Sequence, residues 1–338
     1  MCKQLVNSST IQTTCLLVYL STCQLKESTC QLVNLLTRQL IKMTFKEIKI
    51  TQRRNVALVC PHDSHTEYVV ERALNEGIAN FILFKTKTIS SHLQMVIDEH
   101  ASGVTVVSCA DDVEASNLAV AAVKRGDADV LMKGTISSDI LLHAVLNKQC
   151  GLLKSGAVMT HLTFVEIPAL GRMFLFSDAA VLPQPTLEQF DAIVRECANA
   201  CRSIGIEQPH IALTNCAEKV NPKFEHTLSY VEIMRRAEAG DYGNVVVGGP
   251  MDVKTALEKE GAAIKGITSP VVGKADVLVF PNIQAGNTFY KTLTLFAGAE
   301  VAGLIVGTTA PVVVASRADS EVSKYYSLLM ACRLKSEK

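Results

Sequence analysis

Short apolar runs alternate with longer amphipathic segments from residue 50 onward. The first runs lie at 55–59, 81–84, 104–108 and 129–132, and turn-forming residues separate each run from the next amphipathic segment. Runs of this length predict buried strands, whereas the intervening segments, with apolar residues three or four positions apart, predict helices. Strands separated by helices form βαβ units, so we expect a largely parallel sheet in this part of the chain.

Several helix boundaries carry a local signal. Ser64 with Glu67, and Thr186 with Gln189, have the spacing of a capping box, in which each side chain satisfies a free backbone N–H group. Gly126 stands where an Ala-rich helix should end, because glycine readily adopts the left-handed conformation of that position. These signals predict the ends of three helices, independently of the apolar pattern.

The middle of the chain departs from the alternation. Two apolar stretches, 158–167 and 173–177, flank a turn at 168–171, and this arrangement predicts a β-hairpin. Further strands and a final helix are expected at 210–214, 244–248, 277–280, 304–306, 312–315 and 319–333. The whole pattern predicts two α/β domains, with the hairpin at the entry to the second.

Residues 1–42 do not match the rest of the chain. They contain many Thr, Ser and Gln residues, four cysteines, and neither Gly nor Pro. Two interpretations stay open for this leader, a misassigned start codon or an appended helix. Met43 begins the segment with ordinary globular character, so we favour the first interpretation, in which the atypical leader 1–42 is not part of the native protein.

Composition narrows the classes of function. Hydrophobic residues make up 48% of the 338 residues, which is enough for extensive cores. Lys and Arg together number 33, as do Asp and Glu, so the chain lacks the basic excess typical of nucleic-acid binding. No apolar run approaches the roughly 18 residues of a membrane span. We therefore expect neither a nucleic acid nor a membrane as partner.

The eleven cysteines are scattered and show no CxxC spacing. This distribution favours buried thiols in a reducing cytoplasm over a disulfide framework, and it predicts no metal site. His62 and His65 flank Asp63 and Ser64 at the start of the first helix. The two histidines could ligate a metal, but no third ligand is in view, and Asp and Ser are ordinary helix-start residues.

Two segments offer polar groups after predicted strands. Lys133, Gly134 and Thr135 end one strand and lead into a helix. Ligands of parallel α/β sheets bind at the carboxyl ends of strands, and helix N-termini attract phosphate oxygens, so this segment suits a phosphorylated ligand. The alternative is a capped surface turn. Asn282 and Asn287 lie in the second segment, where we expect a polar loop after the strand and a helix beginning near residue 287.

A third segment ends the strand at 312–315 with Ser316 and Arg317, just ahead of the last helix. Arginine offers a planar fork for phosphate, and an adjacent hydroxyl can hydrogen-bond a developing charge. The nucleotide and protease fingerprints GxGxxG, GxxxxGK[ST], HExxH and GxSxG are absent. Their absence argues against a Rossmann dehydrogenase, a P-loop NTPase, a zinc protease and an α/β-hydrolase.

Together these segments resemble the phosphate acetyltransferase and phosphate butyryltransferase family, and the butyryl branch more closely. The resemblance extends over nearly everything from about residue 50 to 335. It rests on LMKG at 131–134, AVLNK at 144–148, PTLEQ at 185–189, GGP at 248–250, FPNIQAGNTFYK at 280–291, GAE at 298–300 and SR at 316–317. The FPNxxAGNxxYK and SR motifs, in that order, are the most specific.

The resemblance implies an α/β fold with two three-layer α/β/α domains flanking a cleft, of the isocitrate/isopropylmalate dehydrogenase-like kind. The chain would return to its first domain near its end. The expected domains are therefore 43–152 plus 302–338, and 153–301. The leader 1–42 has no counterpart in the family, and the resemblance also implies a homo-oligomer.

The resemblance further implies reversible transfer of a short acyl group, butyryl or similar, between coenzyme A and inorganic phosphate. Coenzyme A would be a substrate, and neither a cofactor nor a metal would be needed. By the same resemblance, Arg317 would hold the phosphate or acyl phosphate, and Ser316 would hydrogen-bond the thiol or the oxyanion. The expected substrate contacts are Lys133, Gly134, Thr135, His143, Asn282, Gly286, Asn287 and Lys291.

The sequence departs from the family pattern at three positions. The acidic base of the acetyl branch, seven positions after the serine of the SR motif, is here Ser323. The resemblance therefore does not identify the general base. Asp319 is the catalytic candidate, and Glu321 is a nearby carboxylate. His143 stands where arginine is usual, and Lys254 where aspartate is usual.

Other functions remain as alternatives at this point. The chain could be a phosphate acetyltransferase, or a non-catalytic phosphotransacetylase-like binding domain. Two further enzyme classes share the expected fold, a phosphate acyltransferase of lipid synthesis that uses acyl carrier protein, and an NAD-dependent decarboxylating dehydrogenase of hydroxy acids. The dehydrogenase would need a cluster of metal-binding aspartates in the last third, which the sequence lacks.

Overall fold

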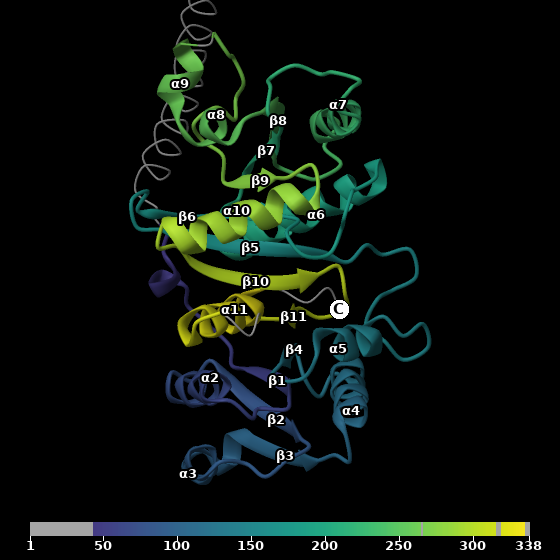
Figure 1. Cartoon of the computed structure of the whole chain (residues 1–338), viewed down its shortest axis with the longest axis vertical. Helices are drawn as coiled ribbons and strands as arrows, with labels where there is room; N and C mark the ends of the chain where they lie inside the picture. The colour runs from purple at the N-terminus through teal and green to yellow at the C-terminus, as the bar shows by residue number, and fades with distance from the viewer. Residues whose placement is uncertain (1–42, 265, 316–318, 335–338) are drawn as a thin grey trace, which may run out of the picture. The chain divides into compact units, whose positions relative to one another are not determined.

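A single mixed sheet organises the fold. The computed structural model describes residues 43–264, 266–315 and 319–334. Across these residues, eleven strands are hydrogen-bonded in the order β3-β2-β1-β4-β11-β10-β5-β6-β9-β7-β8 (Figure 1). The α/β class predicted from the sequence is thereby confirmed.

The strands lie close to the predicted apolar runs. Their bounds are β1 Arg54–Val59, β2 Ala79–Lys85, β3 Val104–Ser108, β4 Val130–Lys133, β5 Thr160–Ile167, β6 Arg172–Ser177, β7 His210–Thr214, β8 Val246–Met251, β9 Val277–Val279, β10 Glu300–Val306 and β11 Val312–Val313. The strand expected at 244–248 is displaced toward the C-terminus, because it continues through the Gly-Gly-Pro motif. Gly249 permits this, since a Cβ there would lie 2.6 Å from the carbonyl oxygen of Leu213 on β7.

Where a helix boundary was predicted from the sequence, the structure agrees with two exceptions. Their bounds are α2 Ser64–Asn75, α3 Ser91–Glu99, α4 Asp112–Arg125, α5 Ser138–Val145, α6 Leu187–Ser203, α7 His226–Glu238, α8 Val253–Leu257, α9 Lys259–Ile264, α10 Ile283–Phe296 and α11 Glu321–Arg333, with short 3₁₀ helices η1 Phe45–Glu47 and η2 Ala101–Gly103. Thr186 and Gln189 form the predicted capping box of α6. Gly126 ends α4 with a φ of 85°, as its position predicted.

The two exceptions are the N-termini of α2 and α10. The cap of α2 is Asp63 and not Ser64, because the Asp63 carboxylate accepts a hydrogen bond from the N–H of Thr66 at 3.0 Å. The loop expected after Pro281 is the beginning of α10. The Asn282 side chain caps that helix by accepting from a backbone N–H of its first turn.

The central hairpin reverses the direction of the sheet. β5 is antiparallel to both of its neighbours, β6 and β10. On one side of this centre, β1 is parallel to β2 and β4. On the other side, β7 is parallel to β8 and β9. Successive side chains of a strand point to opposite faces. His161 and Thr163 of β5 therefore lie on one face of the sheet, and Leu162 lies on the other.

Helices cover both faces of the sheet (Figure 1). α2 packs against α11 on one side of β1, and α4 packs against α5 on the other side. Farther along the sheet, α6 packs against β5, β6 and α7. α10 crosses in front of β5 and β6, and α11 lies against β10 and β11 (Figure 1).

Two groups of buried side chains lie along this continuous sheet. One gathers Val59, Leu131 and Val312 of the strands with apolar residues of α4 and α5. The other gathers Phe176 and Leu278 with apolar residues of α10. The expected division into domains at 43–152 plus 302–338 and at 153–301 stays a prediction.

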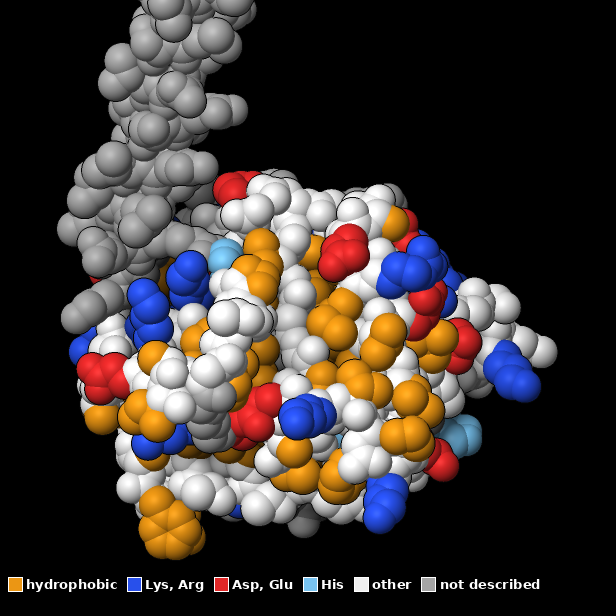
Figure 2. Space-filling view, turned by 90° about the horizontal axis from the view of Figure 1, so that it is seen from above, with side chains coloured by type: hydrophobic (Ala, Val, Ile, Leu, Met, Phe, Trp, Pro, Cys, Tyr) orange, Lys and Arg blue, Asp and Glu red, His pale blue; other side chains and the backbone are white. Residues whose placement is uncertain are grey.

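The surface at α7 and the residues just before it carries exposed apolar side chains. Figure 2 shows this part of the chain, with hydrophobic side chains lying among charged ones. Phe224, Leu228 and Val231 are among the exposed apolar residues of this region. No helix within the described ranges is long and apolar enough to cross a membrane.

Candidate active site

Two hollows share a wall residue just after β11. The α10 cavity, of about 150 Å³, is lined by residues that include His161, Ala179, Asn287, Tyr290, Lys291, Val301, Gly303, Val314, Ala315, Asp319 and Ser323. The Lys133 hollow, of about 470 Å³, is lined by Asp63, Ser64, His65, Lys133, Gly134, Thr135, Ala315 and Lys324. Ala315 lines both. The predicted Ser316 and Arg317 follow it directly in the sequence but lie outside the described residues.

The predicted amide-rich segment positions helix α10. Asn282 accepts a hydrogen bond from the N–H of Ala285 at 2.9 Å and so fixes the start of the helix. Gly286 is the point of closest approach to the chain after β6, because a Cβ there would lie 2.1 Å from the carbonyl oxygen of Asp178. Neither Asn282 nor Gly286 lines the α10 cavity. Both residues instead position α10, and the next turn of this helix lines the cavity.

The next turn of α10 reaches the cavity. The Asn287 amide donates to the carbonyl oxygen of Ala179 at 3.0 Å, and the Lys291 ammonium lies 4.5 Å from the ring centroid of Tyr290. The Tyr290 hydroxyl donates to a carboxylate oxygen of Asp319 at 3.0 Å. Burial, together with this carboxylate, raises the pKa of Tyr290, so the phenol stays protonated and continues to donate.

A buried carboxylate that the sequence did not predict shapes the opposite wall. Asp178 is 1% exposed. One of its oxygens accepts from the Thr160 hydroxyl and from the His161 N–H, both at 2.9 Å. The other accepts from the N–H groups of Ala180 and Val181, at 2.7 and 2.8 Å. The carboxylate thus ties the end of β6 to β5 and holds the turn that lines the cavity.

His161 is a second polar residue that the sequence did not predict. It lies buried on β5, with its Nδ1 3.3 Å from the Thr163 hydroxyl oxygen. Burial lowers the pKa of His161, while the charges of Asp178 and Asp319 act in the opposite direction. The available signal was the group of polar residues Thr160, His161 and Thr163 within the predicted strand.

The Lys133 hollow brings three predicted residues together. The buried Lys133 ammonium donates to the carbonyl oxygens of Gly134 and Ile136, both at 3.1 Å. Gly134 lies against the end of β1, because a Cβ there would be 2.2 Å from the carbonyl oxygen of Cys60. The Thr135 hydroxyl donates to the same oxygen at 3.1 Å. These contacts fix the turn after β4 against the end of β1.

The segment at His62 and His65 has the helix-start role. Asp63 caps α2, and the Lys324 ammonium of α11 lies 3.4 Å from its carboxylate. Burial raises the pKa of Asp63, but hydrogen bonds from Thr66 and the charge of Lys324 outweigh it, so the pKa is lowered. His65 and Lys324 line the hollow. Lys324 had no signal in the sequence, since only the fold brings α11 beside α2.

Two predicted positions, His143 and Ser323, differ in whether they reach a hollow. His143 is exposed on α5 and lines neither hollow, so the structure does not bring it together with the other candidates. Ser323, at the position where an acidic residue was expected, lines the α10 cavity and accepts a hydrogen bond from the Ser320 hydroxyl at 3.2 Å. The carboxylate on this wall is that of Asp319.

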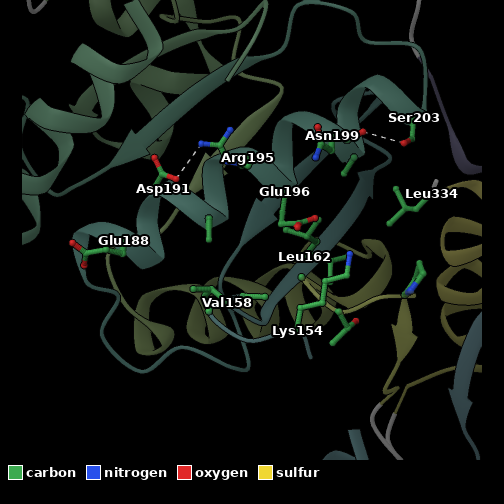
Figure 3. Close-up of a pocket in the computed structure, with 18 of the residues that line it drawn as sticks. Lys154, Val158, Leu162, Glu188, Asp191, Arg195, Glu196, Asn199, Ser203 and Leu334 are labelled. Atoms are coloured by element: carbon green, nitrogen blue, oxygen red, sulfur yellow. Dashed lines mark hydrogen bonds and ion pairs between the residues drawn. The ribbon is translucent and has the colours of Figure 1, made fainter. Parts of the chain in front are cut away.

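A third hollow, of about 430 Å³, lies on the opposite face of the sheet, where Leu162 forms part of its wall (Figure 3). Charged side chains of α6 and α7 pair with one another around it. The Asp191 carboxylate lies 3.2 Å from Arg195 and 2.9 Å from Arg236. Of the site residues predicted from the sequence, none that the structure describes lies in this hollow.

Comparison with known proteins agrees with the motifs. The profile of a family described as phosphate acetyl/butaryl transferase matches residues 100–332. A phosphate acetyltransferase of Thermotoga maritima is 34% identical over 82% of this chain and 94% of that protein. A phosphate butyryltransferase of Clostridium acetobutylicum is 34% identical over 84% of this chain and 94% of that protein.

A solved structure gives the same result. The crystal structure of a branched-chain phosphotransacylase from Enterococcus faecalis V583 superposes with a TM-score of 0.73. Its sequence is 33% identical, and the match covers 83% of this chain and 98% of that one.

Proposed function

Because the chain belongs to the phosphate acetyl/butaryl transferase family, we propose that it transfers a short acyl group reversibly between coenzyme A and inorganic phosphate. The observation that carries the proposal is a convergence of two motifs. The turn that holds Lys133 and the helix turn that holds Asn287 and Lys291 line hollows that share Ala315. Ala315 immediately precedes the Ser316-Arg317 pair in the sequence.

The reaction joins two electron-rich groups at one carbonyl carbon. In one direction phosphate attacks an acyl-CoA and the thiolate leaves, and in the other the thiolate attacks an acyl phosphate. Holding a phosphate dianion beside a thiolate is costly, and a fixed guanidinium offsets this repulsion. We assign that role to Arg317, with Ser316 as hydrogen-bond donor to the oxyanion or the thiol. Asp319 is the proposed catalytic carboxylate.

The proposed substrate contacts divide between the two hollows. Lys133, Gly134 and Thr135 would line the larger hollow, which suits the longer substrate, coenzyme A. Asn287 and Lys291 would face the smaller α10 cavity, which suits the acyl and phosphoryl groups. Asn282 and Gly286 would act by positioning α10, and His143 would contact the outer part of the substrate.

The acyl group is proposed to be butyryl or a similar short chain. Val301 and Val314 give the α10 cavity an apolar wall, and its volume of about 150 Å³ leaves room for a chain longer than acetyl. A phosphate acetyltransferase is the second candidate, because a relative of that name is as similar as the butyryltransferase. A non-catalytic binding domain of the same family is the third.

The remaining expectations belong to the same proposal. They are two three-layer domains flanking a cleft, as in isocitrate and isopropylmalate dehydrogenases, a homo-oligomeric assembly, and a cytoplasmic location. The proposal also includes a reaction without metal or other cofactor. The mass of the purified protein in solution tests the assembly, and a thiol-release assay repeated with EDTA tests the metal.

The thiol-release assay also tests the proposed function. Acetyl-, propionyl-, butyryl- and isobutyryl-CoA are each incubated with the protein, with and without phosphate, and free thiol is measured. We expect phosphate-dependent release that is fastest with a four-carbon chain and unchanged by EDTA. Fastest release with acetyl-CoA favours the acetyltransferase. No release with any of the four contradicts the proposed function.

A further inference from the structure

A buried imidazole in the α10 cavity has no role in the function proposed above. His161 is 9% exposed, and it lines the cavity from β5. Its Nδ1 lies 3.3 Å from the Thr163 hydroxyl oxygen, which can accept a hydrogen bond from that nitrogen. No side chain or backbone group of the described residues hydrogen-bonds Nε2. One ring nitrogen is therefore held, and the other is available to a substrate.

Gly303 of β10 shows which way the ring faces. A Cβ at Gly303 would lie 3.0 Å from Nε2 and 3.3 Å from Cε1 of His161. Gly303 itself lines the α10 cavity. The Nε2 edge of the ring thus lies at the cavity wall, beside the one residue type that adds no side chain there.

The surroundings of His161 suit a base that is neutral before the reaction and charged during it. Asp178 and Asp319 act on the ring from the end of β6 and from the segment before α11, and Tyr290 and Lys291 of α10 line the same cavity. Burial lowers the pKa of His161, which leaves its nitrogen unprotonated near neutral pH. The two carboxylates would then stabilise the imidazolium once a proton has arrived.

We propose that His161 is the general base of the transfer, a role that rests on the proposed function. When coenzyme A attacks an acyl phosphate, Nε2 takes the thiol proton as the carbon–sulfur bond forms. The carbon–oxygen bond to phosphate then breaks, and the imidazolium returns the same proton to the departing phosphate oxygen. In the reverse direction, Nε2 takes a proton from the attacking phosphate and gives it to the departing thiolate.

His161 would supply the general base that is missing at Ser323, where the acetyl branch of the family has an acidic residue. The cavity has a carboxylate in Asp319, but Tyr290 already donates to it. The Asp319 charge would therefore serve to stabilise the imidazolium, which is the direction in which it acts on the pKa of His161. Proton transfer by a positioned histidine typically contributes about 100- to 10,000-fold in rate.

The test compares His161→Gln with wild type and with His210→Gln as a matched control. His210 is an equally buried histidine on β7 that lines neither hollow. Thiolysis of butyryl phosphate is followed from pH 5 to 9, roughly the range in which a histidine titrates. We expect His161→Gln to lose about 100-fold or more in kcat with little change in KM for coenzyme A. The His210 variant should keep the wild-type rate.

The pH profile separates a base from a structural residue. Wild-type kcat/KM should fall as the pH drops through the His161 pKa, below its ordinary value of 6.5, and this limb should disappear in His161→Gln. Gly303→Ala, which crowds Nε2, should reduce kcat in a second and independent way. A His161→Gln enzyme that keeps the wild-type rate and acid limb overturns the assignment.

Three outcomes complete the test. If His161→Gln does not fold, by its melting temperature, Gly303→Ala decides, and full activity with the wild-type acid limb in that variant overturns the assignment. Wild-type protein that shows no transfer in either direction overturns the proposed function and the base together. An active wild type with an active His161→Gln removes the base alone.

Discussion

Asp178 shows how much one buried carboxylate contributes to this site. It accepts four hydrogen bonds, two of them from the backbone N–H groups of Ala180 and Val181. We expect Asp178→Asn to cost about 1–3 kcal/mol of unfolding free energy, because in either orientation the amide nitrogen would face at least one backbone N–H group, which can only donate. Denaturant unfolding measures the loss. The control is Asp191→Asn, in the hollow on the other face of the sheet. Unlike a change at the site, this substitution should leave the rate of acyl transfer unchanged.

Gly286 is a position where any side chain is excluded. A Cβ would meet the carbonyl oxygen of Asp178 at 2.1 Å, so Gly286→Ala must displace α10 or the turn after β6. Overpacking of this kind typically costs about 1–3 kcal/mol. We predict a lower melting temperature and a reduced kcat for Gly286→Ala. Thr288→Ala, an exposed change on the same helix, should alter neither, and an unaffected Gly286→Ala enzyme would contradict the described packing.

At the N-terminus of α2, the residue that caps the helix can be tested directly. Asp63→Ala should cost about 0.5–2 kcal/mol at neutral pH, the usual value of an N-cap, whereas Ser64→Ala should cost little. The pKa of Asp63 is lowered in the folded protein. The stability that the Asp63 carboxylate contributes is therefore fully present above pH 3.8, the ordinary pKa. It is lost as the pH falls through the lower pKa of the folded protein.

Unfolding of both variants by urea, at neutral pH and below pH 3.8, checks this. The difference between wild type and Asp63→Ala should shrink at the acidic pH. A larger loss for Ser64→Ala than for Asp63→Ala would return the cap to the position predicted from the sequence.

Helices and strands were predictable to the extent that their signals are local. The capping box at Thr186 and the terminal Gly126 depend on residues within a few positions of each other, and both predictions are confirmed. The start of α10 was wrong because Gly286 was interpreted as a loop residue. Glycine is required at position 286 because the backbone of Asp178 lies too close for a side chain. This contact is distant in the sequence, so no local pattern predicts it.

In the whole molecule, the site depends on segments that are distant in the sequence. The α10 cavity combines β5, β10, α10, α11 and the turn after β6, and only the antiparallel pairing of β5 with β6 and β10 brings these together. The motifs predicted Lys133, Asn287 and Lys291 as lining residues. They could not predict His161, because a buried polar residue that is simply hydrogen-bonded in the core gives the same sequence pattern.

We propose that acyl transfer to phosphate depends on Ser316 and Arg317, which follow Ala315 in the sequence. The most direct measurement is kcat/KM for phosphate in wild type, Arg317→Ala and Arg317→Lys, with the exposed Arg125→Ala as control. We predict a loss of about 100- to 1,000-fold in Arg317→Ala, no rescue by lysine, whose point charge cannot replace the planar fork, and no change in the control. If Arg317→Ala keeps more than about a tenth of the wild-type kcat/KM, a much smaller loss than expected, Arg317 is not the phosphate ligand.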